Sequence, residues 1–196
     1  MQNAAAAAPA ESAAKQKSTL KFALLIAVFV VGLVADFTSK QVAMNHYKGN
    51  APVTIIDGFL EFSYVENHGM IFGVMNNHHA GLKRWALTGL TLVSLAVILS
   101  IIWRIRELSF FYHLPFFMIL IGAIGNLVDR LRFGFVVDFI HMHWKDVLDY
   151  PWLYNIADAS IVVGVIFLAI LMLIKNDQFE RHLGSHKEKT TAPDEA

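Results

Sequence analysis

The chain has 196 residues, of which 56% are hydrophobic and 16% charged, and its 16 basic and 16 acidic side chains leave a formal net charge of zero. This composition excludes an ordinary soluble domain, and the neutral balance gives no reason to expect a nucleic-acid partner. Because cysteine is absent, disulfides, thiolate metal sites and a cysteine nucleophile are excluded as well.

Four apolar stretches follow one another along the chain, each near the roughly 20 residues that a bilayer-spanning helix needs. We expect them at residues 20–43, 85–103, 110–131 and 154–174. The second is the clearest, because it is uncharged, has Trp85 and Trp103 at its ends and is flanked by basic residues. The predicted fold class is therefore an all-α integral membrane protein with four transmembrane helices.

The first stretch has a rival interpretation as a secretory signal peptide, since lysines precede its apolar run. However, Leu33 occupies the third position before a cut after Ala35, where a small residue is usual. Asp36 and Lys40 also lie one helical turn apart, as if the helix continued. A membrane helix is the favoured interpretation.

The two ends of the chain are expected to be disordered cytoplasmic tails, at residues 1–18 and 179–196, around a single four-helix domain at 19–178. An even number of spans places both termini on one side of the membrane. The termini and the second connection hold nine Lys or Arg residues against seven elsewhere, which favours the cytoplasm for both termini.

The first outer connection, roughly residues 46–84, is long enough to have structure of its own. After the turn residues Asp57 and Gly58, the side chains of Leu60, Phe62 and Tyr64 recur at every second position, which is typical of a strand. We expect a small extracytoplasmic β-sheet within this first outer loop.

Polar side chains gather where this threading places the outer membrane interface. They lie at the ends of the first and third spans, shortly after the third, and at the start of the fourth: Asp36, Lys40, Asn126, Asp129, Arg130, Asp138, Asn155 and Asp158. An ionisable group at membrane depth costs about 3 kcal/mol on the insertion scale, so it is usually retained for pairing or function. For Asp36 with Lys40, and for Asp129 with a basic neighbour, simple ion pairing is about as good an explanation as a function.

Asp138 and Asp158 are harder to explain in this way, because each lies in an apolar context where a lone carboxylate is poorly solvated. Brought together, they could share one proton, so that one acts as base on a water while the other donates to a carbonyl oxygen. That is the chemistry of peptide hydrolysis. Proton relays and ion sites also use paired aspartates in membranes, so the spacing leaves these functions open.

Signatures of other chemistries are missing from the sequence: it has no His-Glu-x-x-His, no Gly-x-Ser-x-Gly and no phosphate-binding P-loop. His141 and His143, one residue apart, are a weak signal for a metal ion. Hydrogen bonding at the interface is their favoured role. Gly122 and Gly125 allow another helix or a substrate backbone to approach the third span closely.

Four motifs in chain order resemble the lipoprotein signal peptidase family, bacterial signal peptidase II. They are Asp36-Phe-Thr-Ser-Lys40, Asn67-His-Gly69-Met-Ile-Phe72-Gly73, Gly122-Ala-Ile-Gly125-Asn126-Leu-Val-Asp129-Arg130 continuing to Val137-Asp138-Phe139, and Asn155-Ile-Ala157-Asp158. The resemblance covers residues 20–174. The chain departs from the family at Ile121, where a second glycine is common, and at Met70 and Ile71, where two small residues are common.

The resemblance implies an aspartic endopeptidase of the bacterial cytoplasmic (inner) membrane, with its active site near the outer face. It would remove signal peptides from diacylglyceryl-modified prolipoproteins, cutting on the N-terminal side of the modified cysteine. The implied catalytic dyad is Asp138 and Asp158. Substrate-binding or supporting roles are implied for Asp36, Lys40, Asn67, Gly69, Asn126, Asp129, Arg130 and Asn155.

The resemblance also implies which molecules the protein meets. Prolipoproteins and membrane lipid are the expected partners, globomycin-like cyclic peptides the expected inhibitors, and neither a metal nor an organic cofactor is expected. A proton-coupled membrane transporter is the main alternative, although polar groups in transporters usually lie near the midplane. A lipid-binding assembly factor is a third, but it needs no carboxylate pair.

Overall fold

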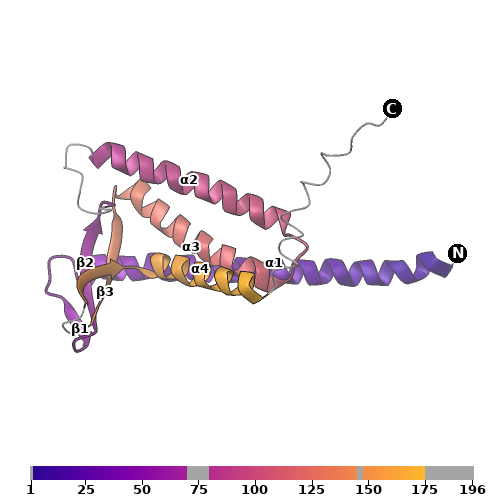
Figure 1. The fold of residues 1–196 in the computed structure, drawn as a ribbon, viewed down its shortest axis with the longest axis horizontal. Coiled ribbons are helices and arrows are strands. Elements are labelled where there is room, and N and C mark those ends of the chain that lie inside the picture. The colour runs from indigo at the N-terminus through magenta and orange to yellow at the C-terminus, as the bar shows by residue number, and fades with distance from the viewer. Residues whose placement is uncertain (1, 70–79, 145–147, 175–196) are drawn as a thin grey trace.

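The computed structural model describes residues 2–69, 80–144 and 148–174. Its helices are α1 (Gln2–His46), α2 (Ala80–Arg104), α3 (Phe110–Arg132) and α4 (Ile156–Ile174), and a small sheet lies at one end of the bundle (Figure 1). Four stretches are long and apolar enough to cross a membrane: Gln16–His46, Arg84–Arg104, Phe110–Arg132 and Ile156–Ile174. By length and composition, the four predicted spans are confirmed.

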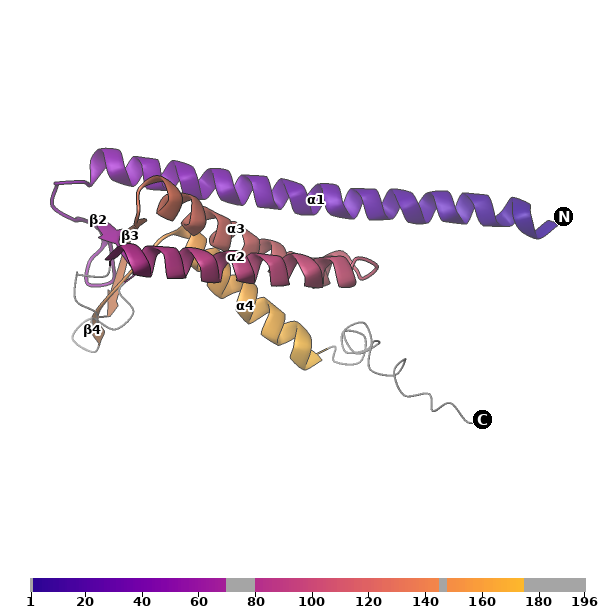
Figure 2. The same ribbon diagram turned by 90° about the horizontal axis from the view of Figure 1, so that it is seen from above.

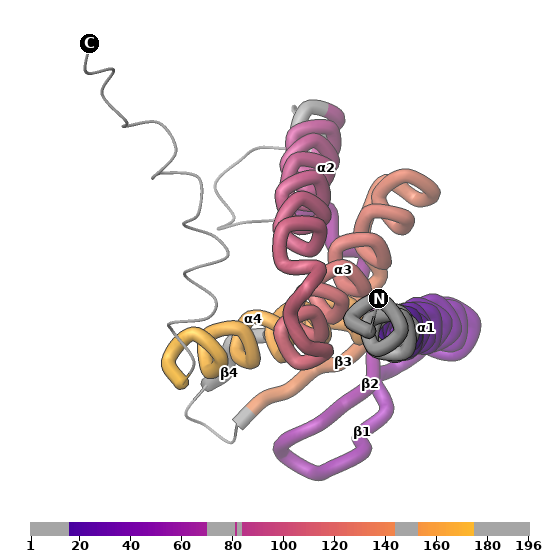
Figure 3. Tube along the Cα trace, turned by 90° about the vertical axis from the view of Figure 1, so that its right-hand side faces the viewer, coloured from indigo at the N-terminus to yellow at the C-terminus, as the bar shows by residue number. Residues whose placement is uncertain are grey.

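Helix α3 is the centre of the bundle, and the other three helices surround it (Figure 3). Its most apolar window is 61% buried inside the protein, whereas the corresponding windows of α1, α2 and α4 are at most 11% buried. The outer helices expose large apolar side chains such as Leu90, Val163 and Leu173. Such a surface is stable in a bilayer, where lipid tails are as apolar as these side chains.

Helix α1 begins at Gln2, so residues 2–18 are helical in the structure and not disordered as predicted. Alanine dominates this segment, and alanine has the highest intrinsic helix propensity, which favours continuing the helix outward from the span. Figure 2 shows α1 extending well past the other helices. The predicted tail at residues 179–196 lies outside the described part of the chain.

The sheet has four antiparallel strands in the order β1-β2-β3-β4. Strands β1 (Val53–Ile56) and β2 (Leu60–Asn67) come from the connection between α1 and α2, where a strand was predicted. Strands β3 (Val136–Trp144) and β4 (Leu148–Tyr154) come from the connection between α3 and α4. The prediction of a sheet within the first outer loop alone is therefore corrected, because the two connections pair side by side through β2 and β3.

The turn from α3 into β3 determines where Asp138 lies. Gly134 has a φ of +88°, a left-handed conformation that glycine adopts without steric cost, and its N–H donates to the carbonyl of Arg130 at 3.2 Å. The Arg84 side chain donates to the carbonyl of Leu131 at 3.0 Å. These contacts satisfy two of the last carbonyls of α3 where the chain turns into β3.

Close packing of α3 against α1 and α4 requires two glycines, as the sequence suggested. A Cβ on Gly125 would lie 2.5 Å from Asp36 Oδ2 on α1, and a Cβ on Gly122 would collide with the carbonyl of Ala157 and the side chain of Ile161 on α4. It is therefore neighbouring helices that approach α3 at these two positions. This approach brings the polar ends of α1, α3 and α4 together.

Candidate active site

The N-terminus of α4 is held by a reciprocal cap. Asn155 precedes the helix, and its Oδ1 accepts the N–H of Asp158 at 3.0 Å. In return, Asp158 Oδ2 accepts the N–H of Asn155 at 3.3 Å. This is the geometry of a capping box, with an aspartate in place of the usual glutamate or glutamine, and it fixes the start of α4 and the place of the Asp158 carboxylate.

Asp36 completes this helix start from a distant part of the sequence. Its Oδ1 accepts the N–H of Ala157 at 2.9 Å, so a carboxylate of α1 lies at the N-terminus of α4. Free N–H groups and the helix dipole both favour an anion there. Asp36 is fully buried, and its position links α1 to α4.

Lys40 of α1 joins side chains of two helices through one buried ammonium group. Its Nζ lies 2.8 Å from Asp36 Oδ2 and 3.0 Å from Asp129 Oδ2 on α3, and it donates to Asn126 Oδ1 at 3.2 Å. Asp129 Oδ2 also accepts the N–H of Val137 at 3.2 Å, which ties β3 to α3. One cation thus balances two buried carboxylates, and the local ion pair predicted for Asp36 and Lys40 is part of a larger network.

Two asparagine side chains join the carboxylates of Asp138 and Asp158. Asn155 Nδ2 donates to Asp138 Oδ1 at 2.7 Å, and Asn126 Nδ2 donates to Asp158 Oδ1 at 2.7 Å. The two amides also contact each other, with Asn155 Nδ2 at 3.3 Å from Asn126 Oδ1. A chain of hydrogen bonds therefore runs from one carboxylate to the other through α3 and the start of α4.

Asn67 approaches Asp138 from the neighbouring strand. Its Nδ2 donates to Asp138 Oδ2 at 2.8 Å, while its Oδ1 accepts the N–H of Gly69 at 2.8 Å. Gly69 has a φ of +78°, and a Cβ there would collide with Leu87 of α2. The turn at Gly69 thus orients the Asn67 amide, and both oxygens of Asp138 accept a hydrogen bond.

The surroundings of Asp138 favour its protonated form. Burial raises the pKa of this carboxyl to about 6; the charge of Asp158 acts in the same direction, while the hydrogen bonds from Asn67 and Asn155 act against it. The side chain is 1% exposed, whereas Asp158 is only half-buried. The two carboxyls therefore lie in different environments within one site, which favours a proton on Asp138.

Arg130 is a second cation near Asp138 and Asp158, and it is not part of the ion pairs that Lys40 makes. Its guanidinium interacts electrostatically with the carboxylates of Asp158, Asp129 and Asp138, most strongly with Asp158. Its Nη1 donates to the carbonyl of Asn126 at 3.5 Å. Among the described residues, no carboxylate oxygen lies within 4.0 Å of it. Within the described part of the chain, its donors other than Nη1 are therefore available to a ligand at this site.

The contacts described above join every site residue predicted from the sequence into one network, although no contact shows what each residue does. Sequence reasoning missed two backbone contributions, the N–H groups of Val137 and Ala157. It also missed the cap at Asn155 and Asp158, although their spacing of three residues before an apolar run is a recognised helix-start signal. The region of Met70 and Ile71, where the chain departs from the family pattern, lies outside the described residues.

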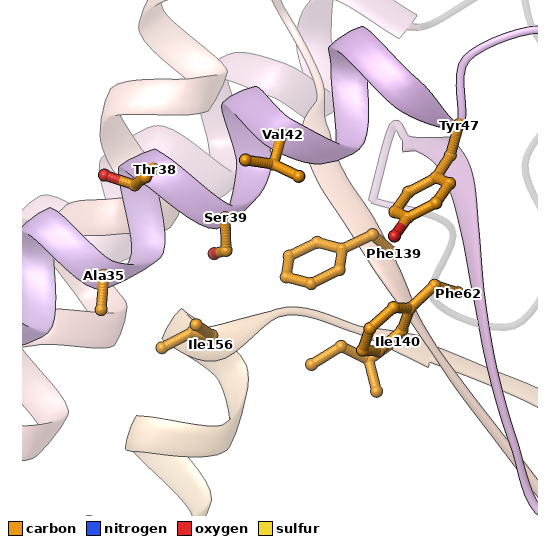
Figure 4. Close-up of a pocket in the computed structure, with 9 residues that line it drawn as sticks. All are labelled: Ala35, Thr38, Ser39, Val42, Tyr47, Phe62, Phe139, Ile140 and Ile156. Carbon is orange, nitrogen blue, oxygen red and sulfur yellow. The ribbon is translucent and has the colours of Figure 1, made fainter. Parts of the chain in front are cut away.

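An apolar pocket of about 470 Å³ lies next to this network (Figure 4). It is bounded by one face of α1, the sheet and the start of α4, and its lining comprises Ala35, Thr38, Ser39, Val42, Tyr47, Phe62, Phe139, Ile140 and Ile156. Phe139 directly follows Asp138, and Ile156 directly follows Asn155. The pocket lining therefore includes direct sequence neighbours of two residues of the network.

The family model described as Signal peptidase (SPase) II matches residues 28–174, which include every residue of the network. The chain belongs to the signal peptidase II family. It is 38% identical over 153 residues to the lipoprotein signal peptidase of Caldanaerobacter subterraneus, covering 78% of this chain and 97% of that relative. Over 153 residues it is also 33% identical to the lipoprotein signal peptidase of Clostridium acetobutylicum, covering 78% of this chain and 96% of the relative.

A solved structure described as a bacterial membrane enzyme has the same fold. It matches with a TM-score of 0.64 at 24% identity, covering 78% of this chain and 94% of the other. Membership of the signal peptidase II family makes the protein a peptidase, and the four spans make it a multi-pass membrane protein. Hydrolysis of a peptide bond is therefore the reaction of this protein.

Proposed function

We propose that Asp138 and Asp158 are the catalytic dyad of an aspartic endopeptidase that removes signal peptides from diacylglyceryl-modified prolipoproteins. One observation carries this proposal: two carboxyls of different burial are held in one site by Asn126 and Asn155. The names of the curated relatives support lipoprotein precursors as the substrate class. Cleavage would occur on the N-terminal side of the modified cysteine.

In the proposed mechanism, Asp158 is the ionised partner and Asp138 carries the shared proton. Asp158 takes a proton from a water, which attacks the scissile carbonyl carbon, while Asp138 donates its proton to the carbonyl oxygen. When the tetrahedral intermediate collapses, Asp158 passes the proton that it took from water to the nitrogen of the modified cysteine, and the carbonyl oxygen returns its proton to Asp138. The C–N bond then breaks, and the amine leaves. No step requires a metal or an organic cofactor.

The lipid on the substrate explains why such a site would lie at the end of the spans. A diacylglyceryl group is anchored in the membrane by its acyl chains, so the peptide bond next to it lies at the membrane surface. The apolar pocket between α1, the sheet and the start of α4 has the lining that an acyl chain requires. We place the sheet on the outer face of the bacterial inner membrane and both termini in the cytoplasm, in line with the distribution of basic residues.

The direct test is cleavage of a purified lipid-modified precursor by the protein in detergent. We expect a single cut before the modified cysteine, no cut in the same precursor without its lipid, and inhibition by a globomycin-like cyclic peptide. A precursor that remains intact while the protein conducts protons in vesicles would instead favour a transporter. Binding of the precursor without either activity would favour an assembly factor.

The pH dependence of cleavage should distinguish the dyad from a histidine base. Because the pKa of Asp138 is raised to about 6, the singly protonated pair exists below this pH and loses its proton above it. We expect a bell-shaped profile of kcat/KM whose alkaline limb lies near pH 6, with both limbs belonging to the pair. Catalysis by a histidine base would give the opposite trend, because kcat/KM would increase as pH rises through about 6.5.

The matched variants for this profile are His141→Gln and His143→Gln. Both limbs should stay in place in these variants, because neither imidazole takes part in the proposed proton transfers. A limb that disappears or moves by a full pH unit or more would assign the titration to a histidine and remove the dyad mechanism.

Arg130→Lys should reduce kcat/KM by about 10- to 100-fold, although the charge is kept. A guanidinium offers directed donors in a fixed plane, whereas an ammonium offers a single charged point, and a hydrogen bond to a charged group contributes about 1.5–3 kcal/mol. Cleavage rates at saturating and limiting substrate would separate an effect on kcat from one on KM. Kinetics equal to those of the parent would mean that Arg130 only stabilises the C-terminus of α3 through its charge.

A further inference from the structure

Two histidines and a glutamate meet on the sheet, separately from the peptidase site. Glu61 of β2 is the direct cross-strand partner of His141 in β3, and His143 lies two residues further along, on the same face of the strand. The two imidazole rings have their centroids 5.1 Å apart. One ligand atom from each of the three residues can be chosen so that all three lie within 4.8 Å of one another.

The glutamate is oriented toward the imidazoles by a neighbouring strand. Thr54 of β1 donates from its hydroxyl to Glu61 Oε1 at 3.3 Å, which leaves Oε2 at 3.7 Å from His141 Nδ1. A hydrogen-bonded partner behind a carboxylate or imidazole is what orients ligands in metal sites. This Thr54 contact therefore resembles the outer shell of a metal site.

An independent observation comes from His143. Its Nδ1 is buried and has no hydrogen-bond partner in the described part of the chain. A buried polar nitrogen without a partner costs about 1–3 kcal/mol, and an imidazole nitrogen is a preferred ligand of transition metals. A cation bound between the rings would satisfy this atom.

We propose that Glu61, His141 and His143 bind one divalent transition-metal ion, with zinc as the best match to this donor set. Two imidazoles and a carboxylate suit Zn²⁺, with the fourth tetrahedral position left to water. Ligand atoms around tetrahedral zinc, with bonds of about 2.1 Å, lie about 3.4 Å apart, so side-chain movements of about 1 Å would close the site.

This site goes beyond the proposed peptidase function and does not take part in it. Side chains alternate along β3, so His141 and His143 lie on the opposite face from Asp138. The metal would cross-link β2 to β3, the same two strands that hold Asn67 against Asp138. Its expected effect is to stabilise the sheet that supports the site, while hydrolysis itself proceeds without it.

The test is metal binding by the untagged full chain in detergent, stripped with chelator and titrated with Zn²⁺ by calorimetry. We expect one ion per chain in the parent, and a matching Co²⁺ complex with the visible absorption of tetrahedral coordination. Glu61→Gln, His141→Gln and His143→Gln should each weaken binding by about 100-fold or more, and Thr54→Val by about 10-fold. His46→Gln, an exposed histidine at the end of α1, should bind as the parent does.

Two further readouts keep this test separate from that of the peptidase. Zn²⁺ should raise the thermal midpoint of the parent but not of the His141→Gln/His143→Gln double variant, and all these proteins should cleave precursor in the presence of chelator. The absence of saturable binding in the parent, or equal binding in the double variant, would overturn the metal site. Activity that chelator abolishes and Zn²⁺ restores would instead show that the metal takes part in hydrolysis, contrary to both proposals.

Discussion

Replacing Asp138 or Asp158 with asparagine is expected to lower kcat/KM for a lipid-modified precursor by about 10³-fold or more. Asparagine keeps the size and polarity of the side chain but cannot ionise, so it can neither take a proton from water nor donate an acidic one. General acid and base catalysis each contribute about 10²- to 10⁴-fold, and both depend on the pair. Asp57→Asn is the matched control, because Asp57 is an exposed carboxylate in the turn between β1 and β2 and should retain the parent rate.

A stability measurement shows whether the inactive variants are folded. A carboxyl whose pKa is raised on folding stabilises the native state at low pH and loses that contribution as pH rises from about 4 to about 6. For Asp138 this amounts to about 3 kcal/mol, from a pKa of about 6 against the ordinary value of 3.8 for an aspartate side chain. Asp138→Asn should therefore unfold with a weaker dependence on pH than the parent in this range. Substantial cleavage by either variant, or identical pH dependence of stability, would contradict the roles given to the pair.

The four spans could be predicted from the sequence because apolar length is a local property. The sheet could be predicted only in part: β2 has a strand pattern within its own residues, but β3 becomes a strand by pairing with β2, about 70 residues earlier in the chain. An almost continuous apolar run such as Val136–Phe139 does not distinguish a strand from a buried helix segment. The helical segment at residues 2–18 has no periodic apolar face, so only the high helix propensity of its alanines indicates a helix there.

The sequence indicated which polar residues lie near one another, but not how they contact each other. Asp36 and Asp158 could be identified as polar residues at the ends of two spans that meet near the sheet. That Asp36 binds the N–H of Ala157, 121 residues away, depends on how α1 and α4 pack around α3. The pairing of Glu61 with His141 likewise depends on the register between two strands from different connections, so the histidine pair alone gave only a weak metal signal.

Lys40→Met is expected to destabilise the protein by about 3–5 kcal/mol and to abolish cleavage with it. The ammonium group is 2% exposed and lies within 3.0 Å of both Asp36 and Asp129. Removing one partner of a buried ion pair leaves an uncompensated charge, and here two carboxylates would be left. Asp36 would then no longer be held at the start of α4, nor Asp129 at the start of β3, so both carboxyls of the dyad would lose their positions.

The network predicts a rescue as well as a loss. In a triple variant that combines Lys40→Met with Asp36→Asn and Asp129→Asn, no charge is left unpaired, and most of the lost thermal stability should return. Lys48→Met is the matched control, because Lys48 pairs with Glu66 at the surface with 57% of its side chain exposed, and exposed pairs contribute about 1 kcal/mol or less. Thermal unfolding of the four proteins in the same detergent measures these differences. Two outcomes would contradict this account: Lys40→Met as stable as Lys48→Met, or a triple variant less stable than Lys40→Met alone. Either would show that the two carboxylates do not depend on Lys40. The buried ion network would then not be what holds α1, α4 and β3 around α3.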